Sequence, residues 1–293
     1  MYWDVYGSRI NMNEPIWVNY HKHTSLSNRY MKDSPLLPVD YWNELKARYG
    51  DKSCIYTTVE HGWAGNYFKQ YDDLEKFNKK NGTNIRWIYG AEAYWVKDRH
   101  ESDRSNCHII LLARTDKGRK AINKILSIAN KDGYYARPRI DLELIDQLPY
   151  DDVMITTACV AFWNKYDDIA DIVRHLAESF PHFYLEVQAH NTPEQKELNR
   201  RIIQISEALR VPIIAGCDSH VITESQMLDR DELLKSGNIH YEDEDGWYMD
   251  YPTYDVLFER FKQQGVLTDG QIKVAINNTN ALFEFEDIKL DRS

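Results

Sequence analysis

The stretch IWVNYHKHTSLSN, residues 16–28, begins with alternating apolar residues and continues into two histidines separated by a lysine. Such alternation predicts a strand, and successive side chains of a strand point to opposite faces. His21 and His23 therefore share one side, and Lys22 points to the other, where we assign it no role. Two imidazoles at a strand end indicate either a shared metal ion or a solvated terminus. The rest of the chain has to decide between these interpretations.

The composition limits the classes of protein and of partner. The chain has 293 residues, 43% of them hydrophobic, and a net charge of −10. This suffices for one large domain or two small ones. The acidic balance argues against a broad grip on duplex DNA, but bound cations can still attract a phosphate substrate. With no basic, apolar leader and no apolar stretch long enough to span a bilayer, we expect a cytoplasmic protein without a membrane partner.

The cysteines carry no disulfide pattern. They are scattered, without a CxxC pair, and each lies in or beside an apolar run: Cys54, Cys107, Cys159 and Cys217. Such residues are typically buried free thiols, although one of them can serve as a metal ligand.

Short apolar runs alternate with helical patterns. We expect strands at 16–20, 53–59, 85–96, 107–114, 152–160, 182–188 and 211–217. We expect helices at 39–49, 64–81, 116–131, 165–180 and 192–210. The last helix has Thr192 as N-cap, Pro193 at its first position and Gln195 to complete a capping box. Seven strands alternating with helices predict an α/β fold of the β/α-barrel type. An open doubly wound sheet is the alternative, but no GxGxxG follows the first strand.

The same pattern predicts a single domain over residues 1–293. The barrel would occupy about 14–221, followed by a helical C-terminal part at about 222–293. The acidic run at 240–250 is interpreted as a solvated loop rather than as an active site.

Polar residues recur where the predicted strands end, which is where the chemistry of a β/α barrel gathers. They are His21, His23, Glu60, His61, Glu92, Cys159, Glu186, His190, Asp218 and His220. Each signal is weak alone, but buried carboxylates and imidazoles need partners or a metal. Histidine with carboxylate suits zinc, manganese or iron. His108 fits less well, because it opens the fourth strand; a strand antiparallel to its neighbours after a hairpin at 97–106 would explain its position.

Seven blocks of the sequence resemble a known family. HKHTSLSN, VEHGWAGNYF, GAEAYW, HIILLAR, YYARPRID, LEVQAHN and CDSH occur in the order found in the PHP (polymerase and histidinol phosphatase) domain, most similar to that of bacterial replicative DNA polymerase III alpha subunits. The resemblance covers nearly the whole chain. It implies a distorted, TIM-barrel-like seven-stranded barrel with a trinuclear metal centre at its mouth. The implied activity is that of a metal-dependent phosphoesterase, a phosphatase or 3'-5' exonuclease that works through a metal-activated hydroxide.

The resemblance also implies a ligand set for two or three divalent ions of zinc, manganese or iron. The first would be bound by His21, His23, Glu92 and Asp218. The second would be bound by Glu92, which bridges, with His108 and Cys159. The third would be bound by His61, His220 and Asp33. The residues implied to take part directly in catalysis are Glu92, His61 and His220.

Two departures from the family pattern concern this set. The family usually has Thr-Asp-His-Gly where this chain has Val59-Glu60-His61-Gly62. The motif-one ligand normally follows HxH sooner, so either Asp33 or the nearer Asn28 fills that position. The otherwise full ligand set favours activity over a scaffold role.

The chain ends where the polymerase palm would begin. We therefore expect a free-standing PHP protein that does not polymerise DNA, with a phage or another mobile element as the inferred origin.

Residues outside the ligand set are assigned by chemistry. Arg137 and Arg139 are candidates for gripping a substrate phosphate, with an ion pair to Asp141 or Glu143 as the equal alternative. Glu186 and His190 are interpreted as supporting residues around the ligands. Four aromatic residues flank the motifs and can stack a nucleobase, although core packing explains most such residues: Trp63, Tyr94, Tyr134 and Tyr135.

Several functions remain open. The preferred hypothesis is hydrolysis of a phosphate ester in a nucleotide or a single-stranded nucleic-acid end. The alternatives are a small-molecule phosphatase of the histidinol-phosphate type and a non-catalytic, metal-binding module that contacts replication proteins. An amidohydrolase-type deaminase shares HxH on a barrel, but lacks the GxE block and the DxH ending.

Overall fold

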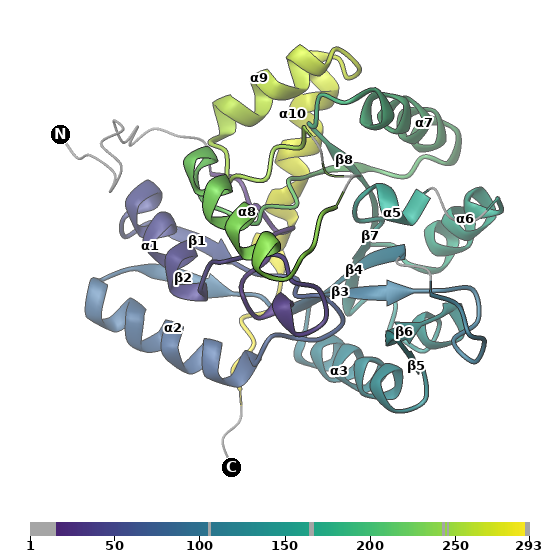
Figure 1. Cartoon of the computed structure of the whole chain (residues 1–293), viewed down its shortest axis with the longest axis horizontal. Helices are drawn as coiled ribbons and strands as arrows, with labels where there is room; N and C mark the ends of the chain where they lie inside the picture. Colours follow the sequence, from purple (N-terminus) through teal and green to yellow (C-terminus); the bar gives the residue numbers. More distant parts are fainter. Residues whose placement is uncertain (1–15, 105–106, 164–166, 242–243, 245, 291–293) are drawn as a thin grey trace.

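The computed structural model describes residues 16–290, apart from 105–106, 164–166, 242–243 and 245. It shows a mixed α/β fold in which helices surround the strands (Figure 1). A two-stranded parallel sheet consists of β1 (Ser53–Tyr56) and β2 (Asn84–Trp87). The remaining strands form a seven-stranded sheet in the order β5-β6-β3-β4-β7-β8-β9. Their bounds are β3 Gly90–Trp95, β4 Cys107–Ala113, β5 Tyr134–Tyr135, β6 Arg137–Ile140, β7 Val153–Thr156, β8 Phe183–Gln188 and β9 Ile213–Gly216.

The direction of β4 determines where its first residues lie. β4 pairs antiparallel with both β3 and β7, whereas β7, β8 and β9 are mutually parallel. The proposed reversal at this strand is therefore confirmed. Because of it, the start of β4 meets the end of β3, and His108 is registered opposite Tyr94. Directly paired residues project on the same face of a sheet, as do alternate residues, so His108 shares a face with Tyr94 and Glu92.

The predicted strand at 16–20 is wrong in its detail. These residues form no regular ladder. The chain pairs only two residues later, where an isolated bridge joins Lys22 to Ser219, which follows β9. The Val59 N–H donates to the Lys22 carbonyl at 3.0 Å, and a second isolated bridge joins His61 to Glu92. One isolated bridge on one side of this segment and one backbone hydrogen bond on the other thus replace strand pairing. Among the described residues, a regular seven-stranded barrel is not present as continuous ladders.

The helices agree closely with the predicted ranges. The barrel part contains α1 Pro38–Tyr49, α2 Tyr67–Asn81, α3 Asp116–Lys131, α4 Leu142–Ile145, α5 Val160–Trp163, α6 Ile169–Ser179 and α7 Pro193–Leu209. Thr192 caps α7 by accepting from the Gln195 N–H, but the Gln195 side chain donates to Asn199 at 3.0 Å and does not complete the capping box. The 3-10 helix η1 spans Ser27–Arg29, in the loop that follows the two histidines.

The C-terminal part is helical, as expected. It contains η2 Glu224–Gln226, α8 Met227–Ser236, α9 Tyr254–Gln264, α10 Asp269–Asn278 and η4 Thr279–Glu284. It packs against the sheet, because the Asn278 amide donates to the Ile213 carbonyl of β9 and Thr279 accepts from the Val18 N–H. None of the helices in the described ranges is long and apolar enough to cross a membrane.

Candidate metal centre

The structure brings all nine predicted ligands into one region. They come from the segments before and after η1, the turn after β1, β3 with the start of β4, the loop after β7 and the turn after β9. Every one of these side chains is buried: His21, His23, Asp33, His61, Glu92, His108, Cys159, Asp218 and His220. Their ligand atoms form three groups, and within each group the atoms lie within 4.8 Å of one another. The groups are His23-Asp33-His61-His220, His21-His23-Glu92 and His61-Glu92-His108.

Glu92 lies at the middle of the cluster, between four imidazoles. Its Oε1 is 3.3 Å from His21 Nε2 and 3.2 Å from His108 Nδ1. Its Oε2 is 2.7 Å from His61 Nδ1 and 3.6 Å from His23 Nε2. A carboxylate offers several lone pairs on two oxygens. Glu92 is therefore placed to serve more than one cation.

Asp218 closes the side of the cluster that holds the two motif histidines. Its Oδ1 is 3.2 Å from both His21 Nε2 and His23 Nε2. This residue has φ +51°, in the left-handed region, which aspartate adopts more readily than most residues. The strained turn after β9 thus directs the carboxylate at the imidazoles.

Asp33, rather than Asn28, faces the remaining histidines. Its Oδ2 is 2.8 Å from His61 Nε2 and also bonds His220 Nε2. The Asn28 amide instead supports this turn: its oxygen accepts from the Asp33 and Ser34 N–H groups, and its nitrogen donates to the Ser34 carbonyl. With the Asn28 side chain engaged by backbone groups, Asp33 is the residue that can act as a ligand here.

Cys159 is adjacent to the cluster. Its Sγ is 3.7 Å from His108 Nδ1, although it belongs to none of the three tight groups. Burial raises the pKa of the Cys159 thiol well above its usual value, and the carboxylates of Asp218 and Glu92 raise it further. A nearby cation would be needed to stabilise the thiolate.

The cluster contains converging polar atoms without hydrogen-bond partners. Among the described residues, the buried atoms in this condition include His21 Nε2, His23 Nε2, His61 Nδ1, both Glu92 oxygens and Asp218 Oδ1. Leaving such groups unsatisfied costs free energy comparable to a lost hydrogen bond each. Lone pairs of nitrogen and oxygen directed at one another fit divalent cations. The residues therefore suit bound metal.

The protonation states of two cluster residues, Glu92 and His23, agree with this use. Although burial raises the pKa of Glu92, the His108 and His61 imidazoles lower it well below its usual value, so the carboxylate is ionised. Burial, together with the neighbouring His61, lowers the pKa of His23 to about 4. His23 is therefore neutral at pH 7, the form of imidazole that donates a lone pair to a metal.

Comparison with known proteins agrees with the geometry. The family model of the PHP domain matches residues 19–190. The chain belongs to the PHP domain family. This family is part of a superfamily of metal-dependent phosphoesterases.

Similar curated proteins are replicative polymerase subunits. DNA polymerase III subunit alpha of Aquifex aeolicus (strain VF5) is 31% identical over 261 residues, which cover 78% of this chain and 21% of that protein. The same subunit of Borreliella burgdorferi is 29% identical over 236 residues, covering 76% and 19%. DNA polymerase III PolC-type of Clostridium perfringens is 23% identical over 193 residues, covering 60% and 13%. The chain thus spans about a fifth of the length of the first two relatives. Its free-standing character and phage origin stay predictions.

Glu186 supports the metal-facing side of this PHP domain. Its Oε1 bonds His21 Nδ1 at 2.7 Å, and its Oε2 accepts from the Tyr20 hydroxyl at 2.5 Å. A carboxylate on the second ring nitrogen fixes the tautomer and orientation of a ligating histidine. This contact is the supporting role that the sequence predicted. His190 lies elsewhere in the network, where its Nδ1 accepts from the Tyr248 N–H at 3.0 Å.

Glu60, which replaces the aspartate usual in PHP domains, organises the loop after the two histidines. Its carboxylate accepts from the Thr24 N–H, the Thr24 hydroxyl and the Ser27 hydroxyl. Ser27 in turn contacts His23 Nδ1 at 3.0 Å. The longer side chain needs Gly65, since a Cβ at this residue, whose φ is +55°, would lie 2.6 Å from Glu60 Cγ.

Arg230 is a functional candidate that the sequence did not reveal. From α8, its Nε donates to the Asp33 carbonyl at 2.8 Å and its Nη2 to Asp33 Oδ1 at 2.7 Å. Glu244 accepts from the same Nη2 at 2.7 Å. The bidentate contact fixes the orientation of Asp33. No local motif marks Arg230, because its partner lies 197 residues away.

The two arginines proposed to bind phosphate have different positions. Arg139 is buried and donates to four backbone carbonyls, those of Arg99, Glu101, Asp103 and Gly133. Its donors serve the fold, which contradicts the substrate role. The alternative was wrong too, because Arg99 makes the ion pairs with Asp141 and Glu143. Arg137 is half-buried, 4.9 Å above the Tyr94 ring, and remains a candidate for binding phosphate.

Proposed function

We propose that the protein is a metal-dependent phosphoesterase that hydrolyses phosphate esters of nucleotides or nucleic-acid ends. The supporting observation is the buried set of imidazole and carboxylate atoms around Glu92, which have no hydrogen-bond partners among the described residues. A fold gains nothing from such a set unless cations occupy it, because each uncompensated group destabilises the folded state.

The proposed ligands follow the contacts. His21, His23, Glu92 and Asp218 would hold one ion, and Glu92, His108 and Cys159 a second. His61, His220 and Asp33 would hold a third. Zinc, manganese or iron suits these donors, and two or three ions fit the three groups. Such ions polarise a phosphoryl oxygen and lower the pKa of bound water towards about 7.

The chain's own residues then have defined tasks. Glu92, placed among four histidines, maintains negative charge at the centre of the cluster. Glu186 fixes His21, and Arg230 fixes Asp33, so that both ligands are oriented before substrate arrives. Arg137, whose Nη1 donates to the Tyr94 hydroxyl at 3.0 Å, would offer its other donors to a substrate phosphate.

A second candidate function is a non-catalytic module that contacts replication proteins. The relatives are replicative polymerase subunits in which the matching region is about a fifth of the chain. In this case the same cluster would bind metal for stability, and no ester would be hydrolysed.

We also propose that residues 14–221 form one distorted seven-stranded barrel, with residues 222–293 packed on it as part of a single domain. The isolated bridges from Lys22 to Ser219 and from His61 to Glu92 support this proposal, because they link the two-stranded sheet and the histidine segment to the larger sheet.

The test combines elemental analysis with a hydrolysis panel. Protein purified without chelator should contain at least two equivalents of zinc, manganese or iron. Chelation should abolish hydrolysis of a terminal phosphate, a phosphodiester, or both, and adding the metal back should restore it. A preference for histidinol phosphate would instead indicate the small-molecule phosphatase.

The matched variants are His23→Ala and His175→Ala. His175 is partly exposed and pairs with Asp146 on the surface, and neither residue belongs to the cluster. His23→Ala should lose metal and activity, whereas His175→Ala should behave as wild type. A folded His23→Ala protein with full activity would refute the metal mechanism. Stoichiometric metal without any ester hydrolysis would support the non-catalytic module.

A further inference from the structure

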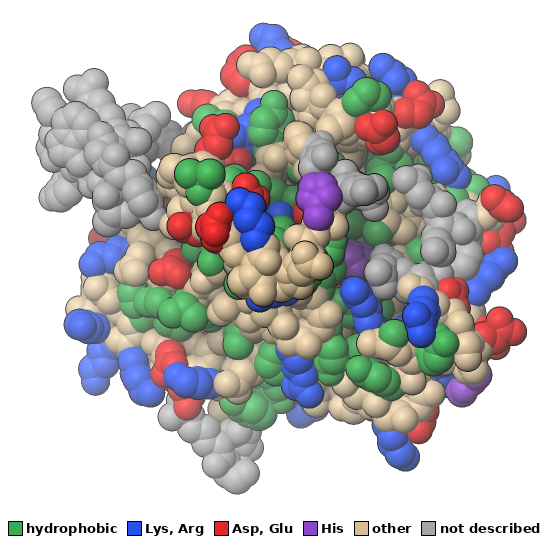
Figure 2. Space-filling model, in the orientation of Figure 1, with side chains coloured by type: hydrophobic (Ala, Val, Ile, Leu, Met, Phe, Trp, Pro, Cys, Tyr) green, Lys and Arg blue, Asp and Glu red, His purple; other side chains and the backbone are tan. Residues whose placement is uncertain are grey.

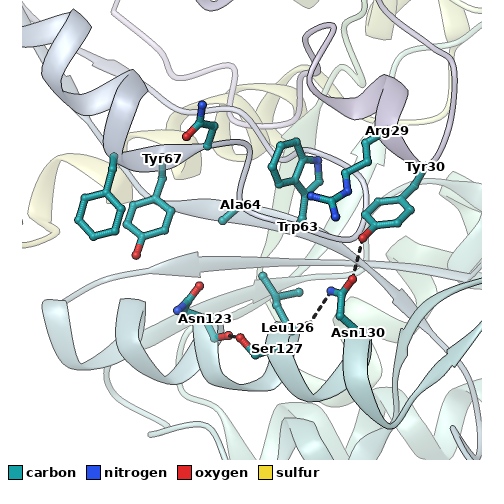
Figure 3. Close-up of a pocket in the computed structure, with 11 residues that line it drawn as sticks. Arg29, Tyr30, Trp63, Ala64, Tyr67, Asn123, Leu126, Ser127 and Asn130 are labelled. Atoms are coloured by element: carbon teal, nitrogen blue, oxygen red, sulfur yellow. Dashed lines mark hydrogen bonds between the residues drawn. The ribbon is translucent and has the colours of Figure 1, made fainter.

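A pocket beside the metal centre has a lining unlike that of the cluster. It has a volume of about 500 Å³ and lies between the η1 segment, the loop at 63–68 and α3 (Figure 3). Hydrophobic side chains also reach the surface in the lower middle of Figure 2, where α2 and α3 approach each other in Figure 1. The volume is in the range of pockets that hold small organic ligands, about 300 to 1,000 Å³.

Aromatic rings and one guanidinium form a wall of the pocket. The Arg29 guanidinium lies 5.0 Å from the centre of the Trp63 ring and 5.2 Å from that of Tyr30. Tyr67 and Phe68 have ring centres 4.3 Å apart, and Phe68 is 52% exposed. Exposed aromatic faces next to arginine are the features that stack the bases of single-stranded nucleic acid and attract its backbone.

The opposite wall combines polar side chains with Leu126. Asn123, Ser127 and Asn130 line it from successive turns of α3, as Figure 3 shows. Asn130 Oδ1 accepts from the Tyr30 hydroxyl at 2.6 Å, which joins the two walls. Ser127 Oγ and Asn130 Nδ2 donate to backbone carbonyls of α3, so the Asn123 amide and the Ser127 oxygen lone pairs are the groups that can pair with the edge of a base whose face is stacked on an aromatic ring.

The pocket shares its walls with the metal centre. The Trp63 indole N–H donates to the Leu26 carbonyl at 3.0 Å, which connects the loop after His61 to the loop after His23. The next residue on that loop, Ser27, contacts His23 Nδ1 at 3.0 Å. The two loops that carry ligands on one side thus present Arg29 and Trp63 to the pocket on the other.

We propose that this pocket binds a nucleobase and the adjoining phosphate of a single-stranded nucleic acid, so that the strand end reaches the neighbouring metal centre. The inference rests on the proposed phosphoesterase function and specifies its substrate class. The net charge of −10 disfavours a duplex, which needs a broad basic surface, whereas a single strand can be held by stacking and a few cations.

The first test measures binding without relying on catalysis. A 5'-fluorescein-labelled dT12 oligonucleotide with phosphorothioate linkages, which resist hydrolysis, is titrated with metal-loaded protein and followed by fluorescence anisotropy. Phe68→Ala should weaken binding about tenfold through the loss of one stacking surface. Arg29→Ala should weaken binding and reduce the slope of log K against log salt by about 1. Phe68 is half exposed, so its truncation should leave the fold intact.

The matched controls lie elsewhere on the surface. Tyr150, 60% exposed, controls for the loss of an exposed ring, and Arg200, paired with Glu197 on α7, for the loss of an exposed guanidinium. Tyr150→Ala and Arg200→Ala should bind dT12 as wild type does.

A small ester separates this inference from the proposed function. Bis(p-nitrophenyl) phosphate reports on the metal centre alone, and Phe68→Ala should hydrolyse it at the wild-type rate. Two results would refute the pocket proposal and leave the phosphoesterase function in place. In the first, wild type hydrolyses this ester but does not bind dT12. In the second, wild type hydrolyses this ester and both Phe68→Ala and Arg29→Ala bind dT12 with wild-type affinity. Phe68-dependent binding of dT12 without ester hydrolysis would support the pocket and refute the phosphoesterase.

Discussion

His21 and His23 lie on one side of their segment, and Lys22, between them, lies on the other. Both sides are buried, but they differ in whether their buried polar atoms have partners within the chain. The histidine side gathers nitrogen and oxygen atoms that have no hydrogen-bond partners in the part of the chain that the structure describes. On the other side, Lys22 Nζ donates to the Asn19 carbonyl at 2.6 Å and lies 5.4 to 5.8 Å from the ring centres of Tyr41, Tyr56 and Tyr251.

This difference distinguishes a site whose polar atoms can bind a ligand from a site whose polar atoms are already bonded within the chain. Carbonyl and ring contacts compensate Lys22 within the chain, and burial lowers its pKa from 10.5 to about 7. On the histidine side, Glu186 and Ser27 bond only the outer ring nitrogens of His21 and His23, and the inward-facing atoms have no hydrogen-bond partner among the described residues, which fits bound cations. Burial by itself therefore does not identify the functional side; the missing partners do.

The largest effect is expected for Glu92→Gln. An amide of the same shape keeps one oxygen acceptor but loses the charge and the second oxygen that faces His61 and His23. Metal content should fall, and ester hydrolysis should drop by about a thousandfold, equivalent to several kcal/mol. Atomic emission analysis and initial rates measure both, with exposed Glu232→Gln as control. Full activity in Glu92→Gln would show that the histidine side does not need the Glu92 carboxylate for function, and would contradict the contrast with the lysine side.

Lys22→Met should stabilise the protein. Below about pH 7 the buried lysine is charged in the folded state, and removing it should raise the free energy of unfolding by roughly 5 kcal/mol, the cost of lowering its pKa from 10.5 to about 7. Between pH 7 and 10 only the unfolded chain binds this proton, so wild-type stability rises with pH and the gap narrows by about 1.4 kcal/mol per pH unit.

Urea unfolding of both proteins from pH 6 to 10, at one fixed metal concentration, measures this gap. Ester hydrolysis by Lys22→Met should match that of wild type, since its side chain faces away from the cluster. A pH-independent gap would show that the folded protein does not shift the pKa of Lys22.

Glu186→Gln tests the support of the histidine side. The amide oxygen is a weaker acceptor for His21 Nδ1–H, 2.7 Å away, than the carboxylate it replaces, and the affinity for metal should fall by about 10- to 100-fold. Competition with a coloured chelator measures that affinity. Unchanged affinity would mean that the tautomer and orientation of His21 are fixed without Glu186.

Tyr41→Phe should have the smallest effect. The Tyr41 hydroxyl, on the lysine side, lies 3.1 Å from the carbonyls of both His23 and Ser219 and donates to them. Its loss should cost about 1 kcal/mol of stability and change ester hydrolysis less than twofold. Thermal unfolding measures the first quantity. A large loss of activity would show that the two sides are coupled through these carbonyls.

Several features could be predicted from the sequence because local signals carry them. The helix predicted at 116–131 has these bounds in the structure, and Thr192 caps α7 as predicted. The antiparallel β4 was suggested by the one misplaced histidine, His108. The strand at 16–20 was predicted wrongly, because apolar alternation records burial but not pairing, and these residues lack a regular ladder.

The roles of Arg137, Arg139 and Arg230 could not be predicted from the neighbouring sequence. Arg137 and Arg139 have the same side chain, two residues apart, and the sequence gives no reason to separate them. The structure surrounds Arg139 with four carbonyls and leaves Arg137 half-buried over Tyr94. Likewise Arg230 and Asp33 meet across 197 residues, a distance over which no periodicity or spacing carries information.

By itself the sequence determined the positions of the long helices, the residue types at the strand ends and the side of the chain on which His21 and His23 lie. These follow from side-chain periodicity and capping, which act over a few residues. Only the tertiary structure decided that Asp33 faces His61, that Glu186 orients His21 and that Arg29 stacks on Trp63. Such contacts depend on how distant loops pack together, and packing is a property of the whole fold.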